Sequence, residues 1–325
     1  MLIAVTGANG FIGSYLCKYL IKVGYQIRPL QRGKGKNVFL INDFKNYNDW
    51  AKALSGVDIV IHCASKVHSF QNSLQEMSDY ELINVLATEN IAREAAKLNI
   101  KKFIFLSTVK VYGEKTLPEN PFNNRTKLQP SDEYSRSKYK AEKIIKELSN
   151  KYGLKFLIIR IPLVYGPGVG ANFLNLIKLV NLNFPLPFGN IRNKRSIIFV
   201  GNLADFIFKC IESKKAVNKN LVVSDLSPVS TKDLIRMIAK GLNKKIIIFK
   251  FPLKFLKFLG KLIGNNEKLN RLTESLEVDA SETFGLLNWI PPYSSEEGIN
   301  STINWFKSNS KKSPNRKLLW LNIYF

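Results

Sequence analysis

The sequence is poor in the residues that build metal sites and disulfide frameworks. Its 325 residues include three cysteines, Cys17, Cys63 and Cys210, and two histidines, His62 and His68. The cysteines lie far apart and share no Cys-x-x-Cys spacing, so neither residue type predicts a cluster of ligands. We therefore expect no metal site, no disulfide framework and a reducing, cytoplasmic environment.

Long apolar runs are also missing. No stretch reaches the ~18 consecutive apolar residues of a membrane span, and Gly7 interrupts the apolar start, which no basic segment precedes. We expect neither a span nor a signal peptide. Peripheral attachment to the inner membrane stays open, because basic and apolar residues alternate over 250–263 and the tail 308–325 is basic and then aromatic. The alternative is that the 250–263 segment packs its apolar face inward.

Acidic residues are scarce relative to basic ones. There are 25 of them against 49 lysines and arginines, which gives a net charge of +24. Nucleic acid, an anionic membrane or an anionic substrate would each suit this charge. The basic residues are spread along the chain, with denser patches at 244–261 and 308–317, and no nucleic-acid motif accompanies them. The pattern favours a lysine-rich surface and predicts no nucleic-acid partner.

Hydrophobic residues are plentiful, at 45% of the chain, and they fall into alternating strand-like and helix-like segments. This alternation predicts an α/β fold with a Rossmann-like, doubly wound parallel sheet. After about residue 165 prolines punctuate shorter elements, which indicates a smaller C-terminal lobe. We predict a nucleotide-binding domain over 1–165 with added strands from 196–225, an interleaved substrate-binding lobe over 166–307, and a tail over 308–325.

A glycine-rich turn follows the first predicted strand. Residues 5–13 read VTGANGFIG, with Gly7, Gly10 and Gly13 between a strand and a helix. Glycine permits a tight turn and close approach of phosphate oxygens to backbone amides at the helix N-terminus. The turn therefore predicts a dinucleotide site, to which its other residues Asn9, Phe11 and Ile12 also belong.

The end of the second predicted strand bears on which dinucleotide binds. It carries Arg28 and Arg32 but no carboxylate for a ribose hydroxyl, which favours NADP over NAD. The alternative is that both arginines are simply exposed. Asp43 follows the next apolar run and is placed either to accept from the adenine amino group or to cap a turn.

Tyr134 and Lys138 lie four residues apart in a predicted helix, hence on one face. A neighbouring ammonium favours the phenolate, so we expect Lys138 to lower the tyrosine pKa from ~10 and make proton transfer feasible. Ser107 and Thr108 end a buried strand, where ligands bind in open α/β sheets. A turn or helix cap is the alternative role for that pair.

Three segments, TGANGFIG, LSTVKVYG and YSRSK, resemble the motifs of extended short-chain dehydrogenases/reductases, the NAD-dependent epimerase/dehydratase family of nucleotide-sugar enzymes. The resemblance covers roughly residues 2–306. It implies that Thr108, Tyr134 and Lys138 are catalytic, that Ala64, Asn84 and Ser107 also line the cofactor, and that NAD or NADP carries the hydride.

The same resemblance implies redox chemistry at C4 of a nucleotide-activated hexose, with UDP as the expected nucleotide. It places Thr108 and Tyr134 at the reacting oxygen and a further set of residues on the nucleotide and diphosphate: Asn172, Phe173, Arg195 and Arg271. It also implies a homodimer built from the helices over 80–98 and 134–151.

Within the family, the leading prediction is 4-keto reduction of the UDP-N-acetylquinovosamine type, for surface-polysaccharide synthesis. The alternative is a UDP-glucose or UDP-N-acetylglucosamine 4-epimerase, and a third is a non-catalytic NADP-binding regulator. Leu163 stands where many epimerases of the family carry asparagine, so a substrate hydrogen bond is absent or replaced. The basic end of the second strand and the resemblance to the quinovosamine-forming enzymes favour reduction. A 4,6-dehydratase is disfavoured, because Val109 and Lys110 occupy the place of its acidic pair.

Overall fold

The computed structural model describes residues 1–33, 35, 38–41, 43–44, 49–67, 79–262 and 266–310, so that His68 and most of the predicted tail lie outside it. Its centre is a seven-stranded sheet in the order β3-β2-β1-β4-β5-β6-β9. All the neighbouring strands pair in parallel. The strands are β1 (Leu2–Thr6), β2 (Gln26–Gln31), β3 (Phe39–Leu40), β4 (Ile59–His62), β5 (Lys102–Thr108), β6 (Phe156–Ile161) and β9 (Lys219–Val222).

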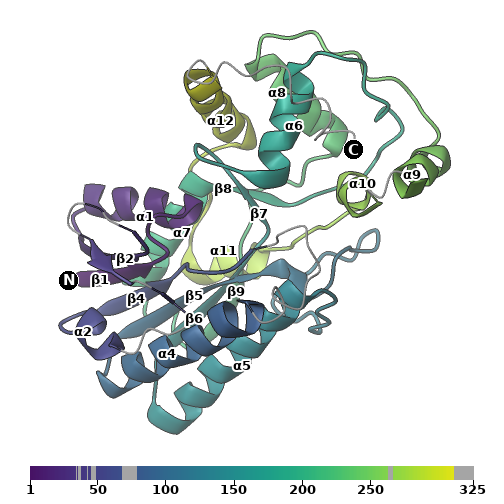
Figure 1. Cartoon of the computed structure of the whole chain (residues 1–325). Coiled ribbons are helices and arrows are strands. Elements are labelled where there is room, and N and C mark those ends of the chain that lie inside the picture. The colour runs from purple at the N-terminus through teal and green to yellow at the C-terminus, as the bar shows by residue number, and fades with distance from the viewer. Residues whose placement is uncertain are drawn as a thin grey trace.

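Helices cover both faces of this sheet (Figure 1). Side chains alternate between the faces along each strand, so Ile3 and Val5 of β1 enter one core while Ala4 enters the other. The first core holds α1 (Phe11–Lys22) and α7 (Val200–Glu212), and the second holds α2 (Trp50–Leu54), α4 (Ala87–Lys97) and α5 (Glu133–Tyr152). The predicted doubly wound sheet is therefore confirmed.

Two short helical segments adjoin the sheet near its carboxyl edge. The predicted helix at 80–98 begins as a π-helical segment, η1 (Tyr80–Leu86), before it continues as α4. Such π-helical turns are rare and occur mostly at functional sites. A 3₁₀ turn, η2 (Val109–Val111), follows β5 directly.

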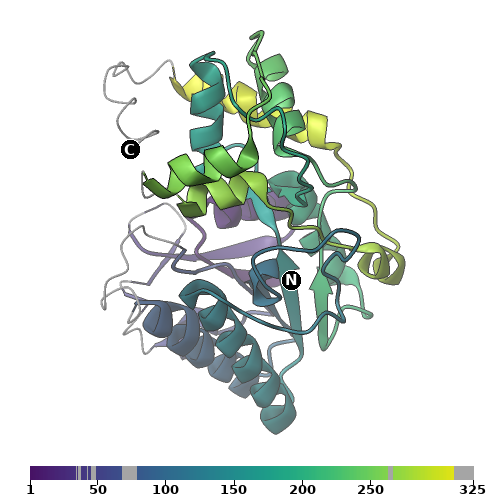
Figure 2. The same ribbon diagram turned by 90° about the vertical axis from the view of Figure 1, so that its right-hand side faces the viewer.

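A smaller lobe lies above the carboxyl edge of the sheet (Figures 1 and 2). Its own core joins the two-stranded sheet of β7 and β8 to α6, α8 and α12. The lobe comprises β7 (Leu163–Tyr165), α6 (Ala171–Asn181), β8 (Ile197–Phe199), α8 (Thr231–Gly241), α9 (Leu253–Leu262), α10 (Asn266–Thr273) and α12 (Ser295–Ser310), while α11 (Ser281–Leu287) packs on the sheet.

The segment 196–225 divides between the two parts of the molecule. β9 joins the main sheet beside β6, as predicted for this segment. β8 instead pairs with β7 in the lobe, so its predicted assignment to the main sheet is wrong. The domain limits near 165 and 307 stay predictions. No helix within the described ranges has the length and apolar character that crossing a bilayer requires.

Candidate active site

The glycine turn after β1 has a shape that only glycine allows. Gly7 has φ +66°, and a Cβ atom there would lie 2.9 Å from the backbone N and Cα of Ala64. A Cβ on Gly13 would lie 2.2 Å from the Gly7 carbonyl oxygen. Gly10 donates its N–H to that same oxygen at 2.9 Å, which closes the turn at the start of α1.

The strand order brings the predicted catalytic segments to one edge. β1, β4 and β5 are consecutive neighbours in the parallel sheet, so their carboxyl ends lie together. The glycine turn follows β1, Ala64 and Ser65 follow β4, and Thr108 ends β5. The Ala64 N–H donates to Thr6 Oγ1 at 3.1 Å, which ties the end of β4 to β1.

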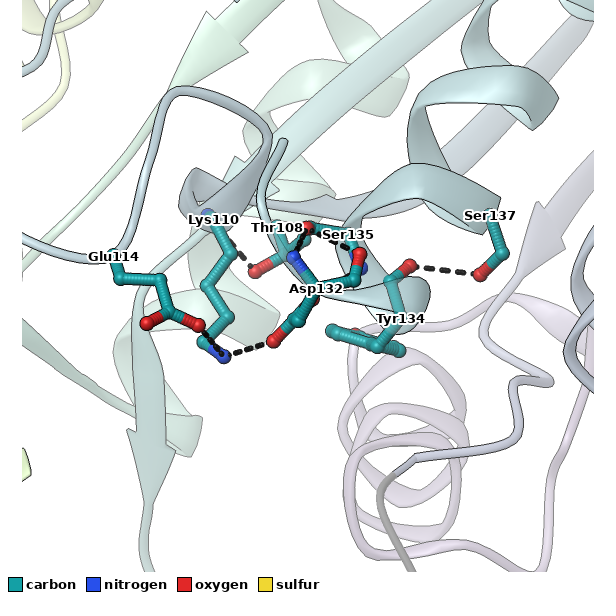
Figure 3. A network of polar contacts seen from close by, with 7 residues as sticks. All are labelled: Thr108, Lys110, Glu114, Asp132, Tyr134, Ser135 and Ser137. Carbon is teal, nitrogen blue, oxygen red and sulfur yellow. Dashed lines mark hydrogen bonds and ion pairs between the residues drawn. The ribbon is translucent and has the colours of Figure 1, made fainter. Parts of the chain in front are cut away.

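Tyr134 lies in the first turn of α5, and a capping box fixes that turn. The N-cap residue Asp132 accepts from the backbone N–H of Ser135 at 2.7 Å, and Ser135 Oγ in turn accepts from the backbone N–H of Asp132 at 3.2 Å. Figure 3 shows this turn beside Thr108, with the Lys110 side chain reaching Asp132. The Tyr134 ring packs against Tyr80 of η1, with ring centroids 6.4 Å apart.

The electrostatics of Tyr134 and Lys138 correct one prediction. Burial raises the pKa of Tyr134, the Asp132 carboxylate raises it further, and a hydrogen bond with Ser65 opposes them. Lys138 is 2% exposed, and burial lowers its pKa to about 7. Its ammonium lies 4.2 Å from the ring centroid of Phe105. The expected lowering of the tyrosine pKa is therefore wrong for this structure, because burial and Asp132 raise it.

Asn84 connects the end of β4 to the helix that carries Tyr134. Its side-chain carbonyl accepts from the Lys66 N–H at 2.8 Å and from Ser65 Oγ at 3.1 Å. Its amide donates to Ser137 Oγ at 2.9 Å, and Ser137 donates to the backbone carbonyl of Tyr134. Asn84 thus holds the turn after β4 and the first turn of α5 in one arrangement, from the π-helical segment η1.

His62 extends this network through the core. Thr88 Oγ1 donates its hydrogen to the backbone carbonyl of Asn84. It therefore accepts from His62 Nε2, at 2.9 Å, and His62 Nδ1 accepts from Thr6 Oγ1 at 2.6 Å. Burial and the Lys138 ammonium lower the pKa of His62 to about 3. The imidazole is therefore a neutral, hydrogen-bonded core residue.

A buried ion pair under the site was not predicted. Arg160 of β6 binds Glu142 of α5 through two hydrogen bonds, of 3.0 and 2.6 Å, and donates to the Tyr112 hydroxyl at 2.7 Å. Ser107 donates to Glu142 at 2.6 Å and is 1% exposed, so its hydroxyl serves this network. The clue in the sequence was Glu142 on the same helix face as Tyr134 and Lys138, opposite an arginine within the apolar strand FLIIRI.

The predicted adenosine-side residues differ in their surroundings. The Arg28 guanidinium donates to the Ala53 and Ser55 carbonyls at 3.0 and 2.7 Å, so it caps the end of α2. Arg32 is exposed, and its carbonyl accepts from the Asn9 amide at 3.1 Å. Asp43 is exposed as well. Phe11 and Ile12 begin α1 half-buried beside the glycine turn.

Two of the four predicted nucleotide contacts lie close together in the lobe. Arg195 donates to the Glu274 carbonyl at 3.0 Å, and burial together with Arg271 lowers its pKa to about 10. Asn172 is half-buried at the start of α6. Phe173 is 2% exposed and its ring stacks on Tyr165 at 5.3 Å, so this side chain packs in the lobe core. No group of three or more metal-binding side chains occurs among the described residues.

Comparison with known proteins agrees with this geometry. The chain is 37% identical to a UDP-glucose 4-epimerase of Vibrio cholerae over 94% of this chain and 95% of the relative. It is 25% identical to N-acetyl-α-D-glucosaminyl-diphospho-ditrans,octacis-undecaprenol 4-epimerase of Escherichia coli O157:H7 over 95% and 96% of the two chains. The solved UDP-glucuronic acid 4-epimerase of Bacillus cereus, in complex with UDP-glucuronic acid and NAD, has a TM-score of 0.78 at 22% identity, over 95% of this chain and all of that one.

The sequence pattern of one family covers most of the sheet domain. It matches residues 3–224, from the first strand and its glycine turn to the last strand of the sheet. The chain therefore belongs to the NAD dependent epimerase/dehydratase family of enzymes.

Proposed function

We propose that this enzyme interconverts the C4 epimers of a nucleotide-activated hexose, with UDP as the nucleotide. The observation that carries the proposal is the meeting of Thr108, the Tyr134 turn and the glycine turn at one edge of the sheet. The Vibrio cholerae relative, named as a UDP-glucose 4-epimerase, supports C4 as the reacting carbon.

Each catalytic side chain has a distinct task in this proposal. Thr108 Oγ1 accepts the Lys110 N–H at 3.2 Å, which leaves its own hydrogen available to the sugar O4. Tyr134 takes the proton from that oxygen and returns it. NAD, held by the glycine turn and Lys138, would supply reversible hydride transfer at C4. Lys138 lies beneath, where its ammonium suits ribose hydroxyls.

The residues present fit a dinucleotide. Gly7 and Gly13 leave no room for a Cβ, which keeps the turn close to the start of α1, the usual place for a pyrophosphate. Lys138 is almost fully buried, and its ammonium lies over the Phe105 ring. A ribose hydroxyl would supply it with a hydrogen-bond acceptor.

The choice between NAD and NADP now depends on one arginine. Arg28 is engaged at the end of α2, so the predicted preference for a 2′-phosphate depends on the exposed Arg32. We propose NAD as the resident cofactor. If wild type and Arg32→Ala each bound NAD and NADP with equal affinity, Arg32 would not be the residue that selects the cofactor.

Arg195 and Arg271 are proposed to bind the substrate diphosphate. The Arg271 guanidinium lies close enough to Arg195 to lower the pKa of Arg195. A diphosphate would neutralise the charges of this cationic pair. Arg195→Met and Arg271→Met should each raise KM for the nucleotide sugar more than they lower kcat.

Reduction of a 4-keto sugar is the second candidate, because it uses the same Thr108, Tyr134 and Lys138 chemistry and stops after one hydride delivery. The observation that favours it is Leu163, which is 43% exposed at the start of β7, where the family pattern offers an asparagine to the substrate. A reductase needs no rotation of a ketone intermediate and loses nothing by that change.

One experiment separates the two reactions. Purified protein would receive UDP-glucose or UDP-N-acetylglucosamine with no added nucleotide cofactor, and products would be resolved by chromatography. Formation of the 4-epimer supports epimerisation. No epimer, together with NADPH or NADH consumption on a UDP-4-keto-6-deoxyhexose, would transfer the assignment to reduction. Tyr134→Phe should lower the rate of either reaction by about 10²–10⁴-fold.

We also propose that the lobe contacts an anionic membrane through an aromatic surface at α9. Its rings form a ladder with centroids 5.6–6.3 Å apart: Phe249, Phe251, Phe255 and Phe258. Phe255 and Phe258 are 52% and 56% exposed, so the expectation that this segment packs its apolar face inward holds for only part of it. Over 244–258 the sequence has five lysines and no acidic residue, which suits anionic lipid.

Sedimentation with vesicles tests this surface. Binding to vesicles with phosphatidylglycerol but not to pure phosphatidylcholine, lost in Phe255→Ser/Phe258→Ser, would support it. Leu117→Ser, at an apolar side chain elsewhere that is 68% exposed, is the matched control. Wild type that stays in the supernatant with both vesicle types at low salt would end the proposal.

The homodimer through η1, α4 and α5 stays a prediction. The mass of the purified protein in solution would test it.

A further inference from the structure

Lys110 contacts both the Thr108 segment and the start of α5, and the proposed reaction leaves these contacts unexplained. It follows Thr108 by two residues, on η2, and its backbone N–H donates to Thr108 Oγ1 at 3.2 Å. Its ammonium forms an ion pair with Asp132, the N-cap of α5, and lies 3.6 Å from Glu114. One residue thus contacts the catalytic threonine through its backbone and the helix start of the catalytic tyrosine through its side chain (Figure 3).

Asp132 links that ammonium to Tyr134. Its carboxylate oxygen Oδ1 accepts from the Ser135 N–H, while Oδ2 pairs with Lys110. Burial acts to raise the pKa of Asp132, but Lys110 and Ser135 hold it below its usual value, so the carboxylate is charged. That charge lies close enough to Tyr134 to oppose formation of its phenolate.

We propose that Lys110 is a positioning residue, which neutralises Asp132 and thereby sets both the placement and the proton affinity of the Tyr134 hydroxyl over Thr108. This inference rests on the proposed C4 chemistry and adds a residue that touches neither sugar nor cofactor. An unneutralised Asp132 would repel a phenolate, and its side chain would lose the ion pair that helps to hold it at the start of α5. Lys110 weakens that repulsion and restrains the side chain.

The groups that face Tyr134 from neighbouring elements define what else could titrate. Tyr80 of η1 packs on its ring, Ser65 after β4 bonds to it, and Lys138 lies one turn further along α5. The Glu114 carboxylate contacts the Lys110 ammonium, and its side chain is 55% exposed. Asp132 is therefore the charged group whose neutralisation changes Tyr134 most directly.

Opposite shifts from the two partners provide the test. Removing the ammonium in Lys110→Met should move the rising limb of the pH profile of kcat up by about 0.5–1 pH unit, because the nearby carboxylate then lacks its ion pair with Lys110. Removing the carboxylate in Asp132→Asn, which keeps a capping side chain, should move it down. At a pH on the limb, Lys110→Met should lose about 3–10-fold in kcat, and Lys110→Arg should restore the profile.

Two controls make the result decisive. Lys140→Met removes a lysine from the exposed face of the same helix, where it pairs with Glu81, and should leave the profile in place. In the Asp132→Asn background, Lys110→Met should have little further effect, since the pair is already broken. Equal profiles for Lys110→Met and Lys140→Met, or full additivity of the two site variants, would overturn the proposal.

A spectroscopic readout separates this inference from the reaction itself. The tyrosinate absorbance that is lost in Tyr134→Phe reports ionisation of Tyr134 whatever the substrate. It should appear at lower pH in Asp132→Asn and at higher pH in Lys110→Met than in wild type, with the unfolding temperature measured alongside. If the protein epimerises nothing but both shifts are present, the proposed function fails and the role of Lys110 stands. Unshifted absorbance together with active epimerase would fail the role of Lys110 alone.

Discussion

Among the described residues, two ion pairs that join the body of α5 to neighbouring elements differ most in burial. Glu142 pairs with Arg160 of β6, and their side chains are 0% and 3% exposed. Lys140 pairs with Glu81 of η1, and these side chains are 57% and 46% exposed. Both pairs are short, at 2.6 and 2.9 Å, so distance alone would rank them as equals.

The difference in burial decides what each pair does. Breaking a buried pair leaves one charge uncompensated in a medium that solvates it poorly, whereas an exposed partner is simply taken up by water. The inner pair therefore fixes how α5 lies on the sheet and, with it, where Tyr134 and Lys138 stand. The Lys110–Asp132 pair, with side chains 21% and 23% exposed, lies between these extremes.

The largest expected effect comes from halving the inner pair. Glu142→Gln leaves Arg160 buried with a weaker partner, and we expect a loss of about 3–5 kcal/mol in the free energy of unfolding. Replacing both partners, as in Glu142→Leu/Arg160→Met, should cost far less, because no charge is then stranded. Urea denaturation of the three proteins measures this. A single variant as stable as wild type would contradict the ranking by burial.

A second effect separates a buried ammonium from a buried pair. Lys138 has a pKa of about 7 in the folded protein, below the ~10.4 of the unfolded chain. The unfolded state thus binds more protons between these values, so the penalty for burying Lys138 is full below about pH 7 and shrinks as pH rises toward 10.4. The stability of wild type relative to Lys138→Met should rise by about 2 kcal/mol between pH ~7 and ~8.5.

Equilibrium unfolding in urea at several pH values checks that slope. Lys143→Met, at an exposed lysine of the same helix whose ammonium lies over Tyr139, controls for the loss of one positive charge. A difference between wild type and Lys138→Met that does not vary with pH would mean that the ammonium is solvated in the folded protein.

The sequence predicted the parts of this molecule that depend on local pattern. The glycine spacing predicts the turn at Gly7–Gly13, and the helix predicted over 134–151 is α5, which runs from 133 to 152. The parallel sheet follows from strand and helix alternation. Each of these features is set by neighbouring residues, which a single sequence displays.

What the sequence did not show depends on residues far apart in the chain. The spacing of Tyr134 and Lys138 shows that they share a helix face but not that burial dominates both pKa values. Arg28 looked like a phosphate ligand because its carbonyl acceptors on α2 are remote in sequence. Arg160 and Glu142 find each other only once β6 lies beside β5 under α5.

A third, smaller effect concerns the cap of α5. Asp132→Ala removes the side chain that accepts from the Ser135 N–H, and we expect a loss of about 1 kcal/mol in the free energy of unfolding. Asp132→Asn should lose less, because its amide oxygen still caps the helix. If the two variants proved equally destabilised, the charge of Asp132 would matter to folding more than its cap, and thermal unfolding of both against wild type decides between these.

The smallest effect completes the comparison at the exposed end. Lys140→Ala breaks the pair with Glu81 but leaves the Glu81 carboxylate in water. The free energy of unfolding should therefore change by no more than about 0.5 kcal/mol. Added salt should make this difference smaller still, because it screens the exposed pair that only wild type has. A double-mutant cycle with Glu81→Ala measures the coupling directly. The coupling could prove as large as that of Glu142 and Arg160. The orientation of η1 against α5, rather than burial, would then govern how strongly these pairs hold α5.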